Sequence, residues 1–172
     1  MFLNKLKWVA LPLVVVSILL FWWCWQPTST VFIVRHAEKG INPPQDPPLT
    51  VAGQARAEAL SHVLKDAGVQ VVIASQFQRT QQTAQPTANE LGLVVQVIDA
   101  GHFDEIAQQA TATAGSVSLI CGHSNTVPDI IEALGGAAMA DIEEDQFDNL
   151  FIVTKQKWHG TTVLPLKYGE MN

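Results

Sequence analysis

The sequence predicts a three-layer α/β/α domain with a mostly parallel, mixed sheet, preceded by one transmembrane helix. Three observations support this prediction. Apolar runs rich in β-branched residues alternate four times with helix-like segments, two further strand-like runs follow them, and a charge-free apolar run precedes them all. Strands that alternate with helices form parallel sheets covered on both faces, because the crossovers are right-handed. The last two strands are joined by a turn, so they make the sheet mixed.

The amino-terminal segment, residues 1–26, is expected to be an uncleaved signal-anchor. Residues 9–25 carry no charge, and Lys5 and Lys7 precede them. As a helix this run is about 25 Å long, the short end of a bilayer span. A cleaved signal peptide or a lipoprotein would need small residues before the cleavage point, where residues 21–25 are bulky aromatic residues and one cysteine. Aromatic side chains at that place are typical of a membrane–water interface.

The two lysines also predict the orientation of this anchor. They favour a cytoplasmic amino terminus by the positive-inside rule. Arg35 and Lys39 follow the apolar run and weaken this bias, but they lie inside the predicted folded domain. We therefore expect residues 8–25 to contact the lipid bilayer, and a single-pass protein with its catalytic domain on the extracytoplasmic, periplasmic side.

The predicted domain, residues 27–172, follows a short linker at 26–30. Strands are predicted at 31–34, 69–74, 93–98, 117–121, 150–154 and 161–166. Helices are predicted at 50–66, 78–91, 104–113 and 127–134. Thr50 is expected to cap the first helix. The apolar face of that helix is expected to comprise Ala52, Ala55, Ala59, Leu60, Val63 and Leu64. Four prolines between residues 41 and 48 predict a loop.

Charge and composition exclude several classes of protein. The 172 residues carry a net charge of −6, and the two lysines before the apolar run are not offset by any acid there. The predicted domain is therefore more acidic than the whole chain, and nucleic-acid binding is excluded because it needs a basic face. A 48% hydrophobic content excludes intrinsic disorder. Cys24 and Cys121 lie in the apolar run and in a predicted strand, so a disulfide between them is not expected.

Two arginines and two histidines follow the carboxyl ends of predicted strands. Arg35 and His36 follow the first strand, Arg79 the second, and His123 the fourth. Parallel strands bring their carboxyl ends to one edge of the sheet, where ligands bind. One such side chain is commonly a surface or capping residue, but four at equivalent positions indicate a site. Arginine binds phosphate bidentately and helix amino termini add donors, so the pattern predicts a phosphate or phosphoryl site.

Four motifs resemble, in order and spacing, those of the histidine phosphatase superfamily, which has the phosphoglycerate-mutase-like fold. Arg35-His36-Ala37-Glu38 is similar to its R-H-G-E signature, with alanine in place of glycine. Residues 49–55 are similar to its L-T-x-x-G-x-x-Q/A stretch, residues 75–84 to S-x-x-x-R-T-x-x-T-A, and residues 122–126 to its second histidine motif. The agreement runs from about residue 31 to 134, and the length is similar to that of the small bacterial members.

The resemblance implies a covalent mechanism. His36 would attack phosphorus and form a phosphohistidine, which water then hydrolyses. Arg35, Arg79 and His123 would bind the phosphoryl oxygens, with His123 protonated, and stabilise the charge of the transition state. Asn42 matches a position at which many members bind the phosphate. No cofactor and no metal are implied.

The resemblance does not identify the general acid. Members usually supply a carboxylate near the end of the third strand, and the candidates here are Asp99, Asp104 and Glu105. Some small members lack an obvious acid, which suits a phosphohistidine or another phosphoramidate. Glu38 is expected to be structural, orienting the arginine and the loop.

The expected function is therefore metal-independent hydrolysis of a phosphomonoester, a phosphosugar or an envelope phosphate. A protein phosphohistidine phosphatase is the alternative, so the partner is a small phosphorylated substrate or a phosphoprotein. A second alternative is a non-catalytic phosphate-binding protein. A mutase is less consistent with the short connections. A zinc site of His36, His102 and His123 is disfavoured because the neighbouring arginines would repel the cation.

Overall fold

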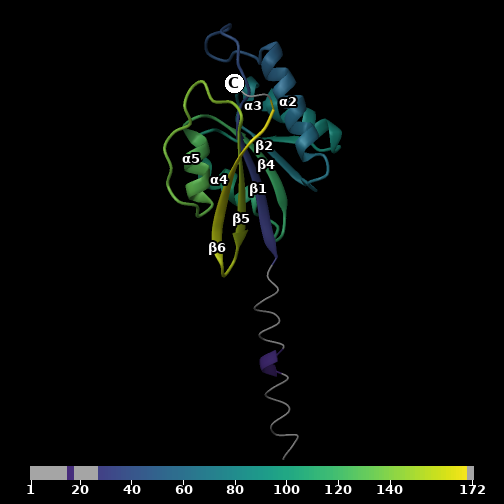
Figure 1. The fold of residues 1–172 in the computed structure, drawn as a ribbon, viewed down its shortest axis with the longest axis vertical. Coiled ribbons are helices and arrows are strands. Elements are labelled where there is room, and N and C mark those ends of the chain that lie inside the picture. Colours follow the sequence, from purple (N-terminus) through teal and green to yellow (C-terminus); the bar gives the residue numbers. More distant parts are fainter. Residues whose placement is uncertain (1–14, 18–26, 170–172) are drawn as a thin grey trace, which may run out of the picture.

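The computed structural model describes residues 15–17 and 27–169. Within this part a six-stranded sheet is covered by helices on both faces (Figure 1). The strands are β1 (Thr28–Arg35), β2 (Val71–Ala74), β3 (Val95–Val97), β4 (Val117–Gly122), β5 (Asn149–Gln156) and β6 (Gly160–Lys167). The helices are α2 (Val51–Leu64), α3 (Gln78–Glu90), α4 (Phe103–Ala110) and α5 (Thr126–Ala133).

The strand order is β3-β2-β4-β1-β5-β6, and it confirms the predicted mixed sheet. The first four strands of this order pair in parallel, whereas β5 is antiparallel to both β1 and β6. The register aligns the carboxyl ends of three strands, because Arg35 lies opposite Gly122 and Ala74 lies opposite Cys121. Side chains that follow β1, β2 and β4 therefore meet at one edge of the sheet.

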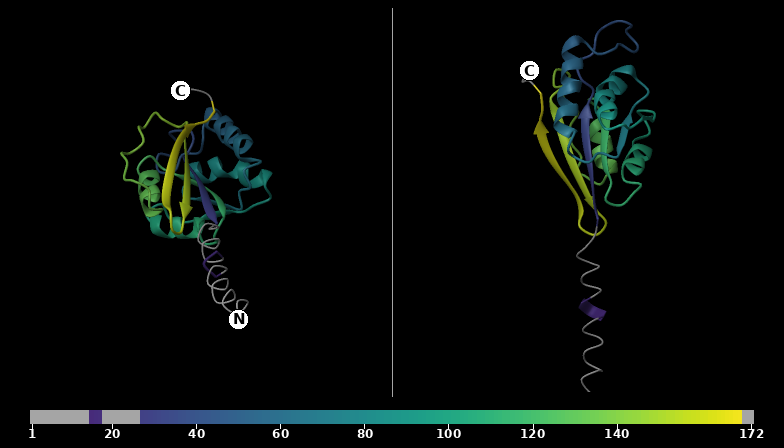
Figure 2. Two further views of the ribbon diagram at one scale, coloured as in Figure 1. Left: turned by 60° about the horizontal axis from the view of Figure 1, so that its bottom comes forward. Right: turned by 90° about the vertical axis from the view of Figure 1, so that its right-hand side faces the viewer.

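The alternation of side chains along β1 builds the two cores of the three-layer fold. Val31 and Ile33 belong to a buried cluster with apolar residues of α4 and α5. Phe32 and Val34 belong to a second buried cluster with residues of α2 and α3. The pairs α2–α3 and α4–α5 thus cover opposite faces of the sheet, as the left view of Figure 2 shows. Each fully buried aliphatic side chain contributes roughly 1.5–3 kcal/mol to folding.

Helix α2 begins as predicted, but it buries a different face. The hydroxyl of Thr50 accepts a hydrogen bond from the amide of Gly53 at 3.1 Å. The buried residues are Gly53, Arg56, Ala57, Leu60, Ser61 and Leu64. Ala52, Ala55 and Val63 are exposed, so the predicted apolar face was wrong at these positions. The reason is that a buried arginine pairs beneath the helix with Glu38, a contact that hydrophobic periodicity does not reveal.

The amino-terminal boundary also differs from the prediction. β1 begins at Thr28, which pairs with Gln156 of β5, so most of the expected linker at 26–30 is a strand. The expected transmembrane segment, residues 8–25, lies outside the described residues except for 15–17. Among the residues that the structure describes, no helix is long and apolar enough to span a bilayer.

Candidate active site

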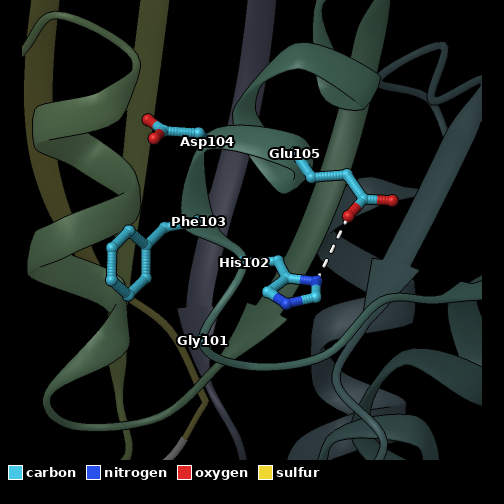
Figure 3. Close-up of a pocket in the computed structure, with 5 residues that line it drawn as sticks. All are labelled: Gly101, His102, Phe103, Asp104 and Glu105. Atoms are coloured by element: carbon cyan, nitrogen blue, oxygen red, sulfur yellow. Dashed lines mark ion pairs between the residues drawn. The ribbon is translucent and has the colours of Figure 1, made fainter.

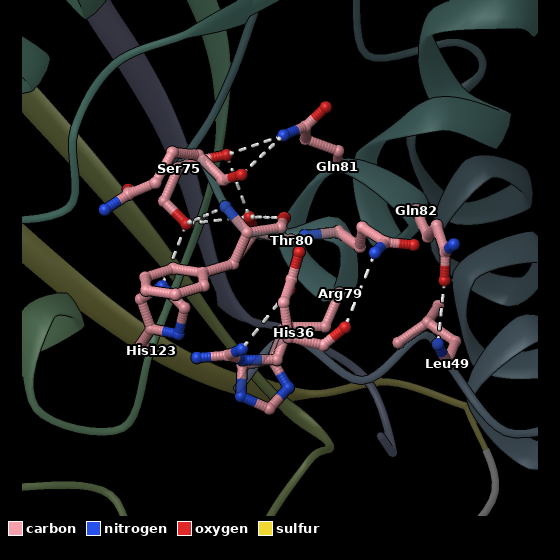
Figure 4. A network of polar contacts seen from close by, with 12 residues as sticks. His36, Leu49, Ser75, Arg79, Thr80, Gln81, Gln82 and His123 are labelled. Atoms are coloured by element: carbon pink, nitrogen blue, oxygen red, sulfur yellow. Dashed lines mark hydrogen bonds and ion pairs between the residues drawn. The ribbon is translucent and has the colours of Figure 1, made fainter. Parts of the chain in front are cut away.

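The structure brings His36 and His123 together at the carboxyl edge of the sheet. The His36 amide donates to the carbonyl oxygen of Gly122 at 2.9 Å, which extends the β1–β4 pairing by one residue. His123 follows that glycine directly, and the ring centroids of the two histidines lie 5.4 Å apart. Both are buried. Arg79 comes from the first turn of α3, after β2, and its position beside them is shown in Figure 4.

The hydrogen bond at His36 defines which ring nitrogen can react. Nδ1 lies 2.8 Å from the carbonyl oxygen of Ala37. A carbonyl oxygen can only accept, so Nδ1 carries the proton and Nε2 carries the free lone pair. The nucleophile that the resemblance implies is thus held in the required tautomer. The amide of Ala37 in turn donates to the Thr83 hydroxyl at 2.9 Å, which ties this turn to α3.

A chain of hydroxyl groups orients His123. Its Nε2 lies 2.9 Å from the Ser75 hydroxyl, which lies 2.8 Å from the hydroxyl of Thr80 (Figure 4). Thr80 donates to the carbonyl oxygen of Phe77 at 2.8 Å. In the donor order that satisfies all three contacts, Ser75 donates to Thr80 and accepts from Nε2–H of His123. Nδ1 of His123 is then the nitrogen that can take up a further proton.

Arg35 and Arg79 supply the positive charge of the site. Arg35 is 1% exposed, and its guanidinium stacks on Phe147 at 4.4 Å from the ring centroid. Arg79 stacks in the same way on Phe77 at 4.3 Å. Within the described part of the chain, the buried Nε atoms of both arginines have no hydrogen-bond partner. Two guanidinium groups that each retain a buried, unsatisfied donor favour the binding of an anion.

The surroundings keep both histidines neutral in the anion-free protein. Burial, together with His123 and the two arginines, lowers the pKa of His36 to about 3. Burial and the two arginines lower the pKa of His123 to about 4. The predicted protonation of His123 concerns the phosphoryl-bound site and stays a prediction. A bound dianion would favour the charged form of His123, because an opposite charge at short range raises a histidine pKa.

A neutral histidine nucleophile beside two unsatisfied arginines suits attack on a phosphoryl group. Residues 31–111 match the family model described as histidine phosphatase superfamily (branch 1). The shared fold of solved structures agrees with that match. Together they support a histidine phosphatase superfamily domain.

Several known proteins are similar to this chain. The probable phosphoglycerate mutase GpmB of Yersinia enterocolitica is 37% identical over 71 residues, which make up 38% of this chain and 33% of that protein. The matched stretch spans a third or less of the curated relatives' length. The protein histidine phosphatase SixA complexed with tungstate is 21% identical, with a TM-score of 0.63 over 80% of this chain and 96% of that one. A phosphoglycerate mutase of Bacillus anthracis is 14% identical, with a TM-score of 0.65 over 82% and 93%. At these identities the structures show the fold.

The structure contains one site element that the sequence analysis missed. Residues 141–148, between α5 and β5, lie beside Arg35. Nη1 of Arg35 donates to the carbonyl oxygens of Glu143 at 2.7 Å and Gln146 at 3.2 Å, and Nη2 donates to the Glu144 carboxylate at 2.8 Å. The sequence did contain a signal for a contact with an arginine, because five of these eight residues are acidic in a chain with few cations.

The three candidate general acids lie on the exposed surface after β3. Asp99 accepts from the side chain of Gln76 at 2.9 Å, and Glu105 lies 3.3 Å from Nδ1 of His102. Asp104 and Glu105 line a cavity of about 370 Å³ at the start of α4 and point in different directions (Figure 3). Neither of these two contacts involves His36, and the roles of the three acids remain predictions.

Asn42 is also exposed, in the loop of residues 41–48. That loop reaches the site through Asp46 instead, whose carboxylate lies 3.7 Å from Nη1 of Arg79. The same carboxylate accepts from the amide of Gln78 at 2.9 Å, at the amino terminus of α3. The predicted contact of Asn42 with phosphate stays a prediction.

Glu38 connects helix α2 to the turn that carries His36. Its carboxylate accepts from Nε and Nη2 of Arg56 at 2.9 and 2.8 Å, and its carbonyl oxygen accepts from the amide of Thr50 at 2.9 Å. A Cβ on Gly53 would lie 2.2 Å from that carbonyl oxygen. Helix α2 therefore packs directly on the turn that carries His36, in keeping with the structural role expected for Glu38.

His102 does not complete a metal site in the described part of the chain. It is exposed at the start of α4, and residues 15–17 and 27–169 contain no group of three potential ligands that could hold a metal ion.

Proposed function

We propose that this protein is a metal-independent phosphatase that hydrolyses a phosphomonoester through a covalent phosphohistidine on His36. The observation that carries the proposal is the unsatisfied pair of guanidinium Nε atoms beside a histidine whose Nε2 is free and neutral. An unsatisfied buried N–H donor is costly, and a phosphoryl group with several oxygens can accept from both arginines at once.

The proposed reaction has two steps. Nε2 of His36 donates its lone pair to phosphorus, and the bond from phosphorus to the leaving oxygen breaks with its electron pair, so that this oxygen takes up a proton from solvent. Water then attacks the phosphohistidine, loses a proton and releases inorganic phosphate, so His36 returns to its starting state. Arg35 and Arg79 stabilise charge on the phosphoryl oxygens in both steps. His123, once protonated beside the dianion, adds a third donor.

A phosphosugar or an envelope phosphate is the proposed substrate class. A mutase must hold its intermediate away from water, which usually requires long insertions that cover the site. The two longest described connections, residues 36–50 between β1 and α2 and residues 134–148 between α5 and β5, have 15 residues each, and the other connections have six or fewer. These features favour hydrolysis over transfer of the phosphoryl group to a second position.

Hydrolysis of a protein phosphohistidine is the second candidate. The exposed positions of the three candidate acids favour it, because imidazole leaves phosphorus more readily than an alkoxide that must be protonated. SixA, a protein histidine phosphatase, shares this fold. A non-catalytic phosphate-binding protein is the remaining alternative.

The test is hydrolysis of an aryl phosphate and of a phosphohistidine peptide by the full chain in detergent, with a chelator present. We expect turnover of the aryl phosphate to survive chelation and to be lost in His36→Ala. His62→Ala is the matched control, because His62 is exposed on α2. Turnover of the peptide alone would favour the second candidate. Absence of turnover for both substrates, with phosphate binding retained, would refute the enzymatic proposal.

We further propose that residues 8–25 anchor the domain to a membrane, with the domain outside the cytoplasm. The charge-free run and the lysines that precede it support this proposal. β1 starts at Thr28, close to that run, and leads to His36 at its other end (Figure 1). Eight strand residues span about 26 Å, so the site would face away from the bilayer.

This arrangement is tested by labelling Gln45→Cys in a Cys24→Ser background with a membrane-impermeant maleimide. Residue 45 is exposed in the loop of residues 41–48, whereas Cys121 is buried and serves as the internal control. We expect labelling in cells whose inner membrane is intact. Labelling only after lysis would refute the orientation, and recovery of the protein without membranes would refute the anchor.

A further inference from the structure

The loop of residues 141–148, hereafter the acidic loop, is fixed at both of its ends. Ile142 is buried in the core, and its amide donates to the carbonyl oxygen of Ser124 at 3.0 Å. Phe147 stacks on Arg35 and lies 6.1 Å from the His36 ring, between centroids. Between these anchors the amide of Gln146 donates to the carbonyl oxygen of Glu143 at 3.0 Å, which closes a turn with Glu144 at its tip.

Glu144 stands out because its side chain is 79% exposed while the guanidinium it contacts is 1% exposed. One carboxylate oxygen accepts from Nη2 of Arg35 at 2.8 Å, and the other accepts from the Ser124 hydroxyl at 2.8 Å. Ser124 follows His123 directly. The carboxylate therefore lies over the edge of the site and occupies one of the donors that a phosphoryl oxygen would use.

We propose that Glu144 is a specificity-determining residue that competes with the phosphoryl group for Arg35, so that substrate must displace its carboxylate. This inference rests on the phosphoryl site proposed above. Within that site the Glu144 carboxylate acts as an internal competitor. This competition sets how much anionic charge a ligand needs before it binds.

Different nitrogen atoms of Arg35 bind the backbone and the carboxylate, which makes such displacement feasible. Nη1 is held by two backbone carbonyl oxygens of the acidic loop, so the guanidinium keeps its place when the carboxylate leaves. Nε remains free for the incoming oxygen. Lys39 is exposed and lies close enough to help lower the pKa of Glu144, so it offers the displaced carboxylate another cation.

Electrostatics give the direction of the effect. A carboxylate and a phosphate dianion on one guanidinium repel each other, and the carboxylate must give up its own contact first. Because Glu144 is largely exposed, water screens both contributions. We expect its removal to tighten phosphate binding by about three- to tenfold rather than by orders of magnitude.

The experiment measures binding of inorganic phosphate and of orthovanadate to the full chain by calorimetry, for the wild type and three variants. Glu144→Ala removes both the charge and the contact, and Glu144→Gln removes the charge but retains an oxygen acceptor. Glu143→Gln is the matched control, because it removes the same charge from the same loop while only the backbone of Glu143 contacts Arg35. We expect both Glu144 variants to bind phosphate three- to tenfold more tightly and the control to change less than twofold.

Two changes in affinity would overturn the proposal by assigning the loop another role. If Glu144 merely positions Arg35, then Glu144→Ala weakens phosphate binding and Glu144→Gln restores it. If the net charge of the loop matters rather than the contact, then Glu143→Gln tightens binding as much as the Glu144 variants.

The readout also separates this proposal from the proposed function. Binding needs no turnover, so an inactive protein that binds phosphate more tightly without Glu144 supports competition while refuting catalysis. An active protein whose affinity for phosphate is unchanged in both Glu144 variants refutes competition and leaves catalysis standing. A wild type and variants that all fail to bind either anion refute the competition outright.

Discussion

Acidification should destabilise this domain through its two buried histidines. The pKa of His36 falls to about 3 and that of His123 to about 4 in the folded protein, whereas histidine ordinarily titrates near 6.5. Between these values the unfolded chain binds protons that the folded site rejects. Stability is therefore fully present above pH 6.5 and is lost as the pH falls toward the folded-state values.

The size of this effect follows from the two shifts. Each pH unit below 6.5 costs about 1.4 kcal/mol for each histidine that stays neutral in the fold. From pH 7 to pH 5, the two histidines together should lower the free energy of unfolding by about 3–4 kcal/mol. A change of that size is a large fraction of the stability of an ordinary domain.

The assay is urea-induced unfolding followed by circular dichroism at pH 7 and pH 5, in phosphate-free buffer. His36→Gln and His123→Gln should each remove about half of the pH dependence, and His62→Gln should leave it unchanged because His62 is exposed. Equal stability at both pH values would contradict the reasoning. So would a full pH dependence in the two glutamine variants, because the protons would then bind elsewhere.

Three further substitutions probe the support of the site. Gly53→Ala should lower the free energy of unfolding by about 2–3 kcal/mol in a urea titration, because its Cβ would lie 2.2 Å from the carbonyl oxygen of Glu38. Arg56→Met should cost about 3 kcal/mol in the same titration by removing the guanidinium that pairs with the half-buried Glu38 carboxylate, and adding Glu38→Gln should recover part of that loss. Ser75→Ala removes the hydroxyl that lies 2.9 Å from Nε2 of His123, so kcat for an aryl phosphate should fall about tenfold while the circular dichroism spectrum stays unchanged.

The fold was largely predictable because its strands carry strong local signals. The continuous apolar run before Arg35 predicts a strand buried on both faces, and the structure buries Val31, Ile33 and Val34 completely. The topology then brings the ends of β1, β2 and β4 to one edge, which is why four polar side chains from three distant parts of the sequence could be assigned to one site. These side chains come together because the backbone of the sheet places them at one edge, and the hydrophobic pattern predicts that sheet.

The contacts that tune the site were not predictable in the same way. The burial of Arg56 beneath α2 depends on a carboxylate 18 residues away, and periodicity counts arginine as a surface residue. The protonation of His123 depends on how completely the fold removes water and where it places two guanidinium groups. Both are properties of the assembled structure. A motif identifies the side chains of a site, but it does not reveal the pKa of each side chain in the folded protein.

Arg35 shows why this distinction matters for interpreting mutations. Its position after β1 predicts a phosphate ligand, yet the structure also uses it to hold the acidic loop through two carbonyl oxygens and the ring of Phe147. A substitution of Arg35 therefore removes a phosphate donor and releases the loop together, and a loss of activity would not separate these causes. Glu144 is the cleaner probe, because its exposed carboxylate contacts the same guanidinium without supporting the core. Whether an anion binds more tightly after its removal tests directly how Arg35 divides its donors between the loop and the ligand.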